Sequence, residues 1–217
     1  MALTARNPSA DADRPAPRID GRRQRSERTK QLIIDAYLSL LRDNPKIPTA
    51  TQVADRAGYS VRSVFERFPD LMALRVAATD QAFAEGMAQA KPRDVDADRE
   101  TRIRSQVEVR SQVCEKWLPL WRALDSNRGE SPDLNLRVKL MRESIRRRIE
   151  LMYRPELSML AEPRRRHLVL AIEAITDFES WGRMREQHGL SVDEACAVWR
   201  RAIDRLLPAA SENSRTS

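Results

Sequence analysis

Helix-forming residues and the scarcity of glycine constrain this chain more than any other feature of its sequence. Alanine, leucine, arginine and glutamate are abundant, and all four are well tolerated in a helix interior. Only 6 of the 217 residues are glycine. No run of β-branched residues alternates with polar ones, as a half-buried strand would require. We therefore predict an all-α protein.

Composition also predicts which terminal segments are disordered and where the chain divides into domains. Residues 1–20 are rich in alanine, proline and aspartate and show no periodicity, so we predict a disordered arm. Residues 208–217 predict a disordered tail. Between these segments we place a small helical domain at 21–74 and a larger helical domain at 75–207.

Proline and capping residues predict the helix boundaries. A first helix is expected from about Ser26 to Asp43, because proline at position 45 cannot continue it. The larger domain should hold longer helices, of which 96–126 contains a break near Pro119. Their expected ranges are 71–91 with Asp70 as N-cap, 96–126, 132–153, 162–187, and a last helix to about 207 opened by the capping box Ser191–Glu194.

Two short helices joined by a tight turn are expected between these regions. Thr49 and Gln52 form a capping box for the first, and Gly58 can adopt the left-handed conformation that ends it. Ser60 caps the second, which runs to about Phe68. This is the spacing of a helix-turn-helix, whose second helix fits the DNA major groove.

At this point the sequence resembles the TetR family of transcriptional regulators. The matching stretch is TATQVADRAGYSVRSVFERFPDLMAL at 49–74, preceded by Ile33-x-x-Ala36-x-x-x-Leu40. The resemblance covers about residues 25–74, and the rest of the chain is similar only in the number, length and order of its helices. It implies an N-terminal three-helix DNA-binding domain and a larger C-terminal helical domain for effector binding and dimerisation.

The resemblance also implies a set of DNA contacts. Thr49 would meet a phosphate at a helix N-terminus, and Arg62 in the first turn of the recognition helix is the first candidate for a guanine contact. Arginines before or at the start of the first helix would lie along phosphates or enter a minor groove. The complete expected set is Arg22, Arg25, Arg28, Thr49, Thr51, Ser60, Val61, Arg62, Ser63, Phe65 and Arg67.

Four positions depart from the family pattern. Phe65 replaces the usual tyrosine and cannot donate a hydrogen bond, whereas Arg67 replaces a histidine and is a stronger phosphate partner. Leu71 stands where a lysine often anchors a phosphate, and Pro45 stands where glycine is usual. These departures put some of the backbone contacts in doubt.

The larger domain is expected to contain a dimer interface and a ligand pocket. Apolar stripes on its last two long helices suit a four-helix bundle between two subunits, although the same stripes could face the chain's own core. The expected interface residues are Leu168, Ile172, Ile175, Val192, Ala195, Trp199 and Ile203. An aromatic face on the middle helices predicts a pocket lined by Val113, Cys114, Trp117, Trp121, Met141 and Ile145.

Charge and composition agree with this interpretation. The net charge of +7 suits a polyanion, either nucleic acid or an anionic membrane surface. No apolar run approaches a membrane span, and the first 20 residues do not form a secretory signal, so we expect a cytoplasmic protein that does not enter a membrane. His167 and His188 are isolated, and no catalytic or metal-binding motif is present, so we expect no metal, no cofactor and no enzymatic activity.

The resemblance thus implies a repressor that binds a palindromic operator in double-stranded DNA as a homodimer and is released by a small-molecule effector of unknown identity. One alternative is the same fold without a small-molecule effector. A second is a basic helical scaffold that binds DNA or a membrane surface without sequence preference, and a third is an enzyme built on a helical bundle.

Overall fold

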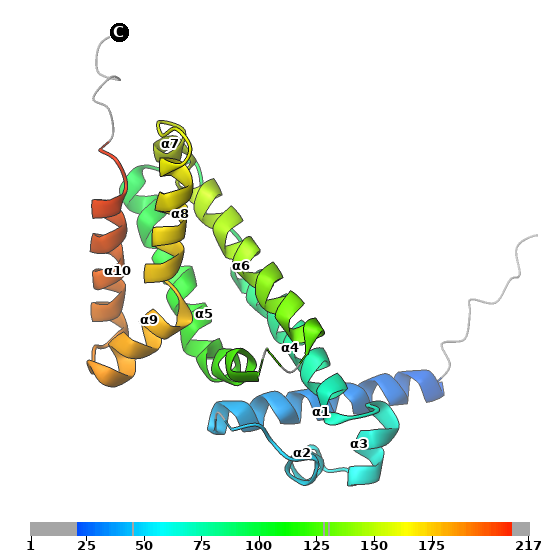
Figure 1. Cartoon of the computed structure of the whole chain (residues 1–217). Coiled ribbons are helices and arrows are strands. Elements are labelled where there is room, and N and C mark those ends of the chain that lie inside the picture. Colours follow the sequence, from blue (N-terminus) through cyan, green and yellow to red (C-terminus); the bar gives the residue numbers. More distant parts are fainter. Residues whose placement is uncertain (1–20, 45, 128, 130, 210–217) are drawn as a thin grey trace, which may run out of the picture.

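The computed structural model describes residues 21–44, 46–127, 129 and 131–209, and within these ranges all the regular structure is helical (Figure 1). The predicted all-α fold is therefore confirmed. The predicted disordered arm at 1–20, Pro45, and nearly all of the predicted tail lie outside the described residues. The elements are α1 (Gly21–Asp43), α2 (Ala50–Ala57), α3 (Val61–Arg67), α4 (Leu71–Gln89), α5 (Arg99–Asn127), α6 (Pro132–Met152), α7 (Arg154–Leu157), α8 (Arg164–Ile175), α9 (Phe178–Gly182), the π-helical turn η2 (Arg183–Gln187) and α10 (Val192–Leu206).

Helices α1, α2 and α3 form a small unit at one end of the molecule (Figure 1). Both predicted capping devices are present: Thr49 and Gln52 form a reciprocal capping box at α2, and the Ser60 hydroxyl accepts the backbone N–H of Ser63 at α3. Gly58 ends α2 with a φ of 73°, which a residue with a Cβ rarely adopts. The local rules of capping and turn chemistry thus fix the geometry between α2 and α3.

Helix α1 begins earlier than predicted, at Gly21 rather than Ser26. The intervening residues include several arginines, which are good helix formers, and the Arg25 Nε donates a hydrogen bond to the Gly21 carbonyl at 3.0 Å. The expected start relied on Ser26 as a cap, and the helix extends through it by about another turn.

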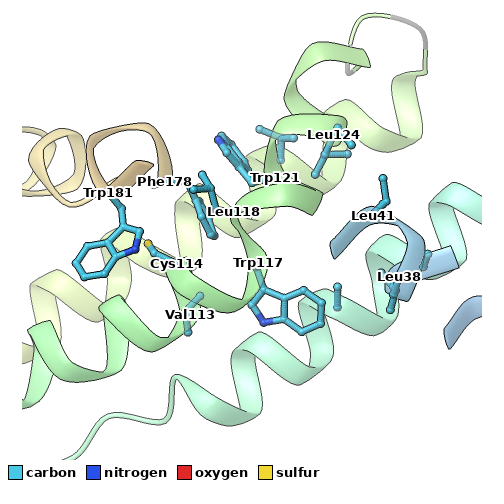
Figure 2. Close-up of a cluster of buried hydrophobic side chains, with 14 of the residues drawn as sticks. Leu38, Leu41, Val113, Cys114, Trp117, Leu118, Trp121, Leu124, Phe178 and Trp181 are labelled. Carbon is cyan, nitrogen blue, oxygen red and sulfur yellow. The ribbon is translucent and has the colours of Figure 1, made fainter. Parts of the chain in front are cut away.

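Helix α5 runs without interruption through Pro119, where a break was predicted. The proline removes one backbone hydrogen bond, which bends a helix without necessarily ending it. Figure 1 shows the last part of α5 turned to lie across the lower end of the bundle. Leu124, in this last part of α5, lies toward Leu41 of α1 (Figure 2).

The single helix predicted at 162–187 is wrong, because the chain breaks after Ile175 into α8, α9 and η2. Asp177 supplies the reason, since its carboxylate accepts the backbone N–H of Ser180 at 2.6 Å and so caps a new helix. The carbonyl of Thr176 is held at the break by the Nε of Arg110, at 2.8 Å. The short helix α7 was also not predicted.

Helix α10 packs against α5 and α8 at the edge opposite α4 (Figure 1). Trp181 and Trp199 meet there with their ring centroids 4.7 Å apart, and both side chains are buried. The guanidinium of Arg99, at the start of α5, holds the end of α10. Its Nε lies 2.9 Å from the Asp204 carboxylate, and its Nη2 donates to the carbonyls of Asp204 and Leu207 at 2.6 and 3.2 Å.

A buried ion pair closes the end of the bundle farthest from α1. Arg102 of α5 contacts both carboxylate oxygens of Glu156 in α7, at 2.8 and 2.6 Å. The same guanidinium donates to the carbonyls of Met152 and Ala97 at 2.6 and 3.1 Å. No helix in the described ranges is both long enough and apolar enough to cross a membrane.

Candidate nucleic-acid interface and cavity

Helix α3 is held in place from beneath by buried apolar side chains. Val53 of α2, Val64 of α3 and Phe68 at the end of α3 are all buried in a core shared with α1. Because these contacts use one face of a helix of two turns, the opposite face of α3 is left in solvent. The unit therefore presents α3 on a rigid base, which is what groove recognition requires.

The exposed face of α3 carries the residues expected to read bases. The side chain of Arg62 is 89% exposed, and its Nε lies 3.2 Å from a carboxylate oxygen of Glu66. Val61 and Ser60 are exposed beside it at the N-terminus of α3, while Ser63 is half-buried. The structure thus gathers these four residues on one surface, with Arg62 projecting farthest into solvent.

Phe65 is also on this surface and is 44% exposed, which is unusual for a phenyl ring in a small helical unit. Leu71, at the position where a lysine often occurs, is instead partly buried against the core. Of these two departures from the family pattern, only Phe65 therefore remains available for contact with a partner.

Arg67 lies at the other end of α3, near the start of α1. Its Nη1 is 3.8 Å from the carboxylate of Glu66, and its Nε is buried with no hydrogen-bond partner among the described residues. Arg67 and Glu66 line a polar hollow together with Arg25, Ser26 and Thr29 of α1. The hollow brings two of the expected phosphate-contacting arginines together, with one acidic residue between them.

Tyr59 is a candidate contact that the sequence analysis passed over. Its ring is 37% exposed in the turn before α3, and its hydroxyl lies 3.4 Å from the hydroxyl of Thr29, which donates to it. A phenol at the edge of a groove-binding helix can donate to a phosphate oxygen. The sequence contains a signal for this role. An aromatic residue in the turn between two helices is not part of either helix's apolar face, so its ring can remain exposed.

The remaining expected contacts lie on α1 and α2. Arg25, Arg28, Thr49 and Thr51 are all exposed. The Thr49 hydroxyl already takes part in the capping box, at 3.3 Å from the backbone nitrogen of Gln52. Arg22 is within α1, and its side chain lies outside the described part of the structure.

A cavity of about 550 Å³ lies in the larger part of the molecule, between α4, α5 and α6. Its wall is mostly apolar and includes Phe83, Gly86 and Met87 of α4 and Phe178 of α9, none of which the sequence analysis named. Trp121 stacks on Phe178 with the ring centroids 5.2 Å apart, and Figure 2 shows Trp117 extending toward α4. A cavity of this size suits a small organic molecule.

The cavity contains five of the six residues expected to form a pocket: Val113, Trp117, Trp121, Met141 and Ile145. Cys114 is the exception, because it is fully buried on another side of α5 near Trp181 (Figure 2). Burial raises the pKa of its thiol to about 11. Cys114 is thus a core residue and the pocket prediction is corrected at that position.

Polar groups in the cavity wall were predicted even less well. Arg148 belongs to the arginine run 146–148, which the sequence predicts to be a solvated helix face. In the structure its guanidinium is buried, and Arg110 and Gln106 of α5 lie in the same wall. The burial of Arg148 depends on how α6 packs against α5, which periodicity alone does not reveal.

Most of the residues expected at the dimer interface lie inside a single chain. Ile172, Ala195, Trp199 and Ile203 are buried within one chain, where they form the core between α8, α10 and α5. Leu168 and Ile175 are half-buried, and only Val192 of the expected set is exposed. The other large apolar residues exposed on these two helices are Leu170, Val198 and Leu206.

Among the described residues, no three or more histidine, cysteine, aspartate or glutamate side chains are grouped so that they could hold a metal ion. No protein-family model matches the sequence, and no curated protein has a significant sequence match to it.

Solved structures show which fold the chain has. A TetR-family transcriptional regulator from Streptomyces coelicolor superimposes with a TM-score of 0.67 at 16% identity, covering 83% of this chain and 80% of the other. A TetR transcription regulator from Haloarcula marismortui gives 0.63 at 14% identity, covering 83% and 97%. The multidrug-binding protein EbrR, solved in complex with imidazole, gives 0.58 at 20% identity, covering 91% and 100%.

These likenesses confirm the fold implied by the sequence resemblance. The chain has the all-α fold of TetR-type regulators, with a helix-turn-helix unit joined to a larger helical part.

Proposed function

We propose that the chain is a transcriptional regulator that binds operator DNA through α3. The observation that carries the proposal is the solvent-exposed face of α3, where Arg62 projects from a helix fixed on a buried apolar base. An arginine in the first turn of such a helix can donate two hydrogen bonds to the major-groove edge of guanine. The neighbouring Val61 is placed to contact a thymine methyl group.

The DNA backbone would be contacted from both sides of α3. Arg25 and Arg28 on α1 and Tyr59 in the turn supply cationic or hydrogen-bonding groups on one side. Thr49 at the N-terminus of α2 supplies the other, where free amides and the helix dipole attract a phosphate. Contacts of this kind fix the register of the protein on DNA, while α3 would read bases in the major groove.

A homodimer is needed because one short recognition helix reads only a few base pairs. Two copies related by a two-fold axis would read a palindrome with half-sites about one helical turn apart. The exposed apolar residues Leu170, Val198 and Leu206 on α8 and α10 are the proposed dimer contacts. The variant Val198→Glu should then run as a monomer in size-exclusion chromatography with light scattering, whereas Leu136→Glu, an equally exposed site on α6, should remain dimeric.

Regulation would act through α4, which is part of both regions. Near its middle Gln81 donates to Asp35 of α1 at 2.8 Å, and the same helix supplies Phe83, Gly86 and Met87 to the cavity. A small molecule in the cavity that favours one position of α4 would therefore bias the position of α1 and α3. The effect expected on operator binding is release, as in a repressor with an inducer.

The decisive experiment is selection of bound sequences from a random DNA pool at roughly physiological salt, where nonspecific binding is weakened. A regulator of this kind should enrich a palindrome. Arg62→Ala should then lose roughly 10- to 100-fold in affinity for that site and tolerate base changes at one position. Arg28→Ala should weaken binding to all sequences alike, and Arg104→Ala, an exposed site on α5, should change neither. A folded, dimeric protein that enriches no sequence would refute the proposal.

A further inference from the structure

The cavity wall contains positive charge that the protein itself leaves without a counter-charge. Arg148 of α6 donates from its Nε to the side-chain oxygen of Gln106, at 2.5 Å. Its two terminal nitrogens, Nη1 and Nη2, are buried and have no hydrogen-bond partner in the described part of the chain. Burying such donors without partners is costly, so their presence calls for an explanation.

A second arginine lies in the same wall. Arg110 of α5 is buried, donates from its Nε to the Thr176 carbonyl, and places its guanidinium 4.7 Å from the centre of the Phe178 ring. Neither Arg110 nor Arg148 has a carboxylate within 4.0 Å among the described residues. Burial lowers the pKa of Arg148 to about 10, with smaller contributions from the cations Arg93 and Arg110, which still leaves Arg148 charged at neutral pH.

The other charged groups of the wall are already paired inside the protein. Arg137 lies 2.6 and 2.7 Å from the carboxylate of Asp80, and the Glu143 carboxylate lies 2.5 Å from Arg147. The positive charge of Arg110 and Arg148 is therefore the net charge of the cavity. Around it are the indole rings of Trp117 and Trp121 and the aliphatic side chains of α4 and α6.

We infer that the cavity binds a hydrophobic carboxylate, with its carboxylate on the free nitrogens of Arg148 and its apolar body between the tryptophans and α4. A guanidinium with both terminal nitrogens free is the group that pairs with a carboxylate through two parallel hydrogen bonds. The mostly apolar wall excludes small, strongly hydrated anions, because they would leave most of the surface uncovered. The binding of a hydrophobic carboxylate follows from the cavity alone; that this ligand acts as the effector of the regulator rests on the proposed function.

The test compares each carboxylate with its neutral amide of the same shape, by titration calorimetry on the full-length protein without DNA. The probes are 2-naphthoate against 2-naphthamide and decanoate against decanamide, with decyltrimethylammonium as the cationic probe. Quenching of tryptophan fluorescence provides a second readout, since Trp117 and Trp121 line the cavity. At least one carboxylate should bind roughly 10- to 100-fold more tightly than its amide, as expected for hydrogen bonds to a charged group.

Variants of Arg148 assign the preference to this residue. Arg148→Met should abolish the preference for the carboxylate while leaving binding of the amide within a few-fold. Its melting temperature should equal or exceed that of the wild type, because an unpaired buried charge has been removed. Arg148→Lys keeps the charge but not the planar pair of donors, and it should retain part of the preference. Arg104→Met, an exposed arginine on α5, should behave as the wild type.

Equal binding of carboxylate and amide, tighter binding of the cation, or a preference that survives in Arg148→Met would each overturn the inference. Failure of the proposed function would look different. Carboxylate binding without enrichment of any DNA sequence would keep the ligand class and refute the regulator. Enrichment of a palindrome without carboxylate preference would keep the regulator and refute the ligand class.

Discussion

Removing the charge of Glu156 should be among the most destabilising single changes in this protein. The side chains of Arg102 and Glu156 are only 5% and 4% exposed, and each terminal nitrogen of the guanidinium contacts a carboxylate oxygen. In Glu156→Gln the arginine keeps its charge and its contacts with backbone carbonyls but loses the carboxylate that both of its terminal nitrogens contact. Breaking one partner of a buried pair costs about 3–5 kcal/mol. For a chain of this size that corresponds to a fall in melting temperature of roughly 6–20 °C.

The measurement is urea unfolding followed by far-UV circular dichroism, at one fixed protein concentration because dimerisation would add to stability. Arg102→Met and the double variant Arg102→Met/Glu156→Gln complete a double-mutant cycle. The loss of unfolding free energy in the double variant should be smaller than the sum of the two single losses by about 2 kcal/mol or more. The matched control is Asp96→Asn, which removes the exposed pair with Arg154 and should change stability little. Additive losses in the cycle, or a loss for Glu156→Gln no larger than that of the control, would refute the reasoning.

Three further predictions follow from local geometry. Glu66→Gln removes the acid that contacts Arg62 on the proposed DNA face, so affinity for DNA should rise a few-fold for all sequences, most at low salt; a fall in a binding titration would contradict this. Gly58→Ala places a Cβ at a φ of 73° and should cost about 1–2 kcal/mol in the same urea assay, while Gly129→Ala is the control. The pKa of Glu194 is lowered mainly by the hydrogen bond from the Ser191 backbone N–H and further by the bond from the Ser191 hydroxyl, so in Ser191→Ala, which removes only the hydroxyl, this pKa should rise part of the way toward its ordinary value in an NMR titration. Since the pKa is lowered in the folded state, the cap at α10 is complete above the unfolded-state pKa and is lost as pH falls through the folded one, and an unchanged pKa in the variant would contradict the assignment.

The sequence predicted the helix-turn-helix unit well because its determinants are local. Thr49, Gln52, Gly58 and Ser60 each act on backbone atoms within three or four residues, so their roles can be inferred without knowing the rest of the fold. The start of α1 is the exception in this unit, since nothing local prevents the arginine-rich segment before Ser26 from continuing the helix.

The larger part of the molecule was predicted less well because its determinants are distant in sequence. The stripe of Ala195, Trp199 and Ile203 was correctly recognised as apolar, but a stripe does not say whether it faces the chain's own core or a second subunit. Arg148 illustrates the same point for charge. Its place in a run of three arginines suggests solvent exposure, and only the packing of α6 on α5 brings it into the cavity wall.

The break at Thr176-Asp177 combines both kinds of determinant. Asp177 followed three residues later by Ser180 is a local capping signal that could have been recognised, but the surrounding apolar residues continue the helical pattern. The contact that holds the break, from Arg110 to the Thr176 carbonyl, joins residues 66 positions apart. The helical spacing of the apolar residues therefore predicted one continuous helix, although the Asp177 cap and the Arg110 contact both end it here.

The contact between Arg99 and the end of α10 means that the segment from α5 to α10 begins and ends at the same place. The three nitrogens of the Arg99 guanidinium bind the Asp204 side chain and the carbonyls of Asp204, Leu207 and Pro208. The first and last residues of this segment are therefore adjacent. A segment whose two ends meet can be inserted into a loop of another protein with little distortion of either. Arg99 therefore marks the point at which this helical segment can be joined to a host protein, and a graft that is to keep the cavity must also carry α4, which supplies Phe83, Gly86 and Met87 to the cavity wall.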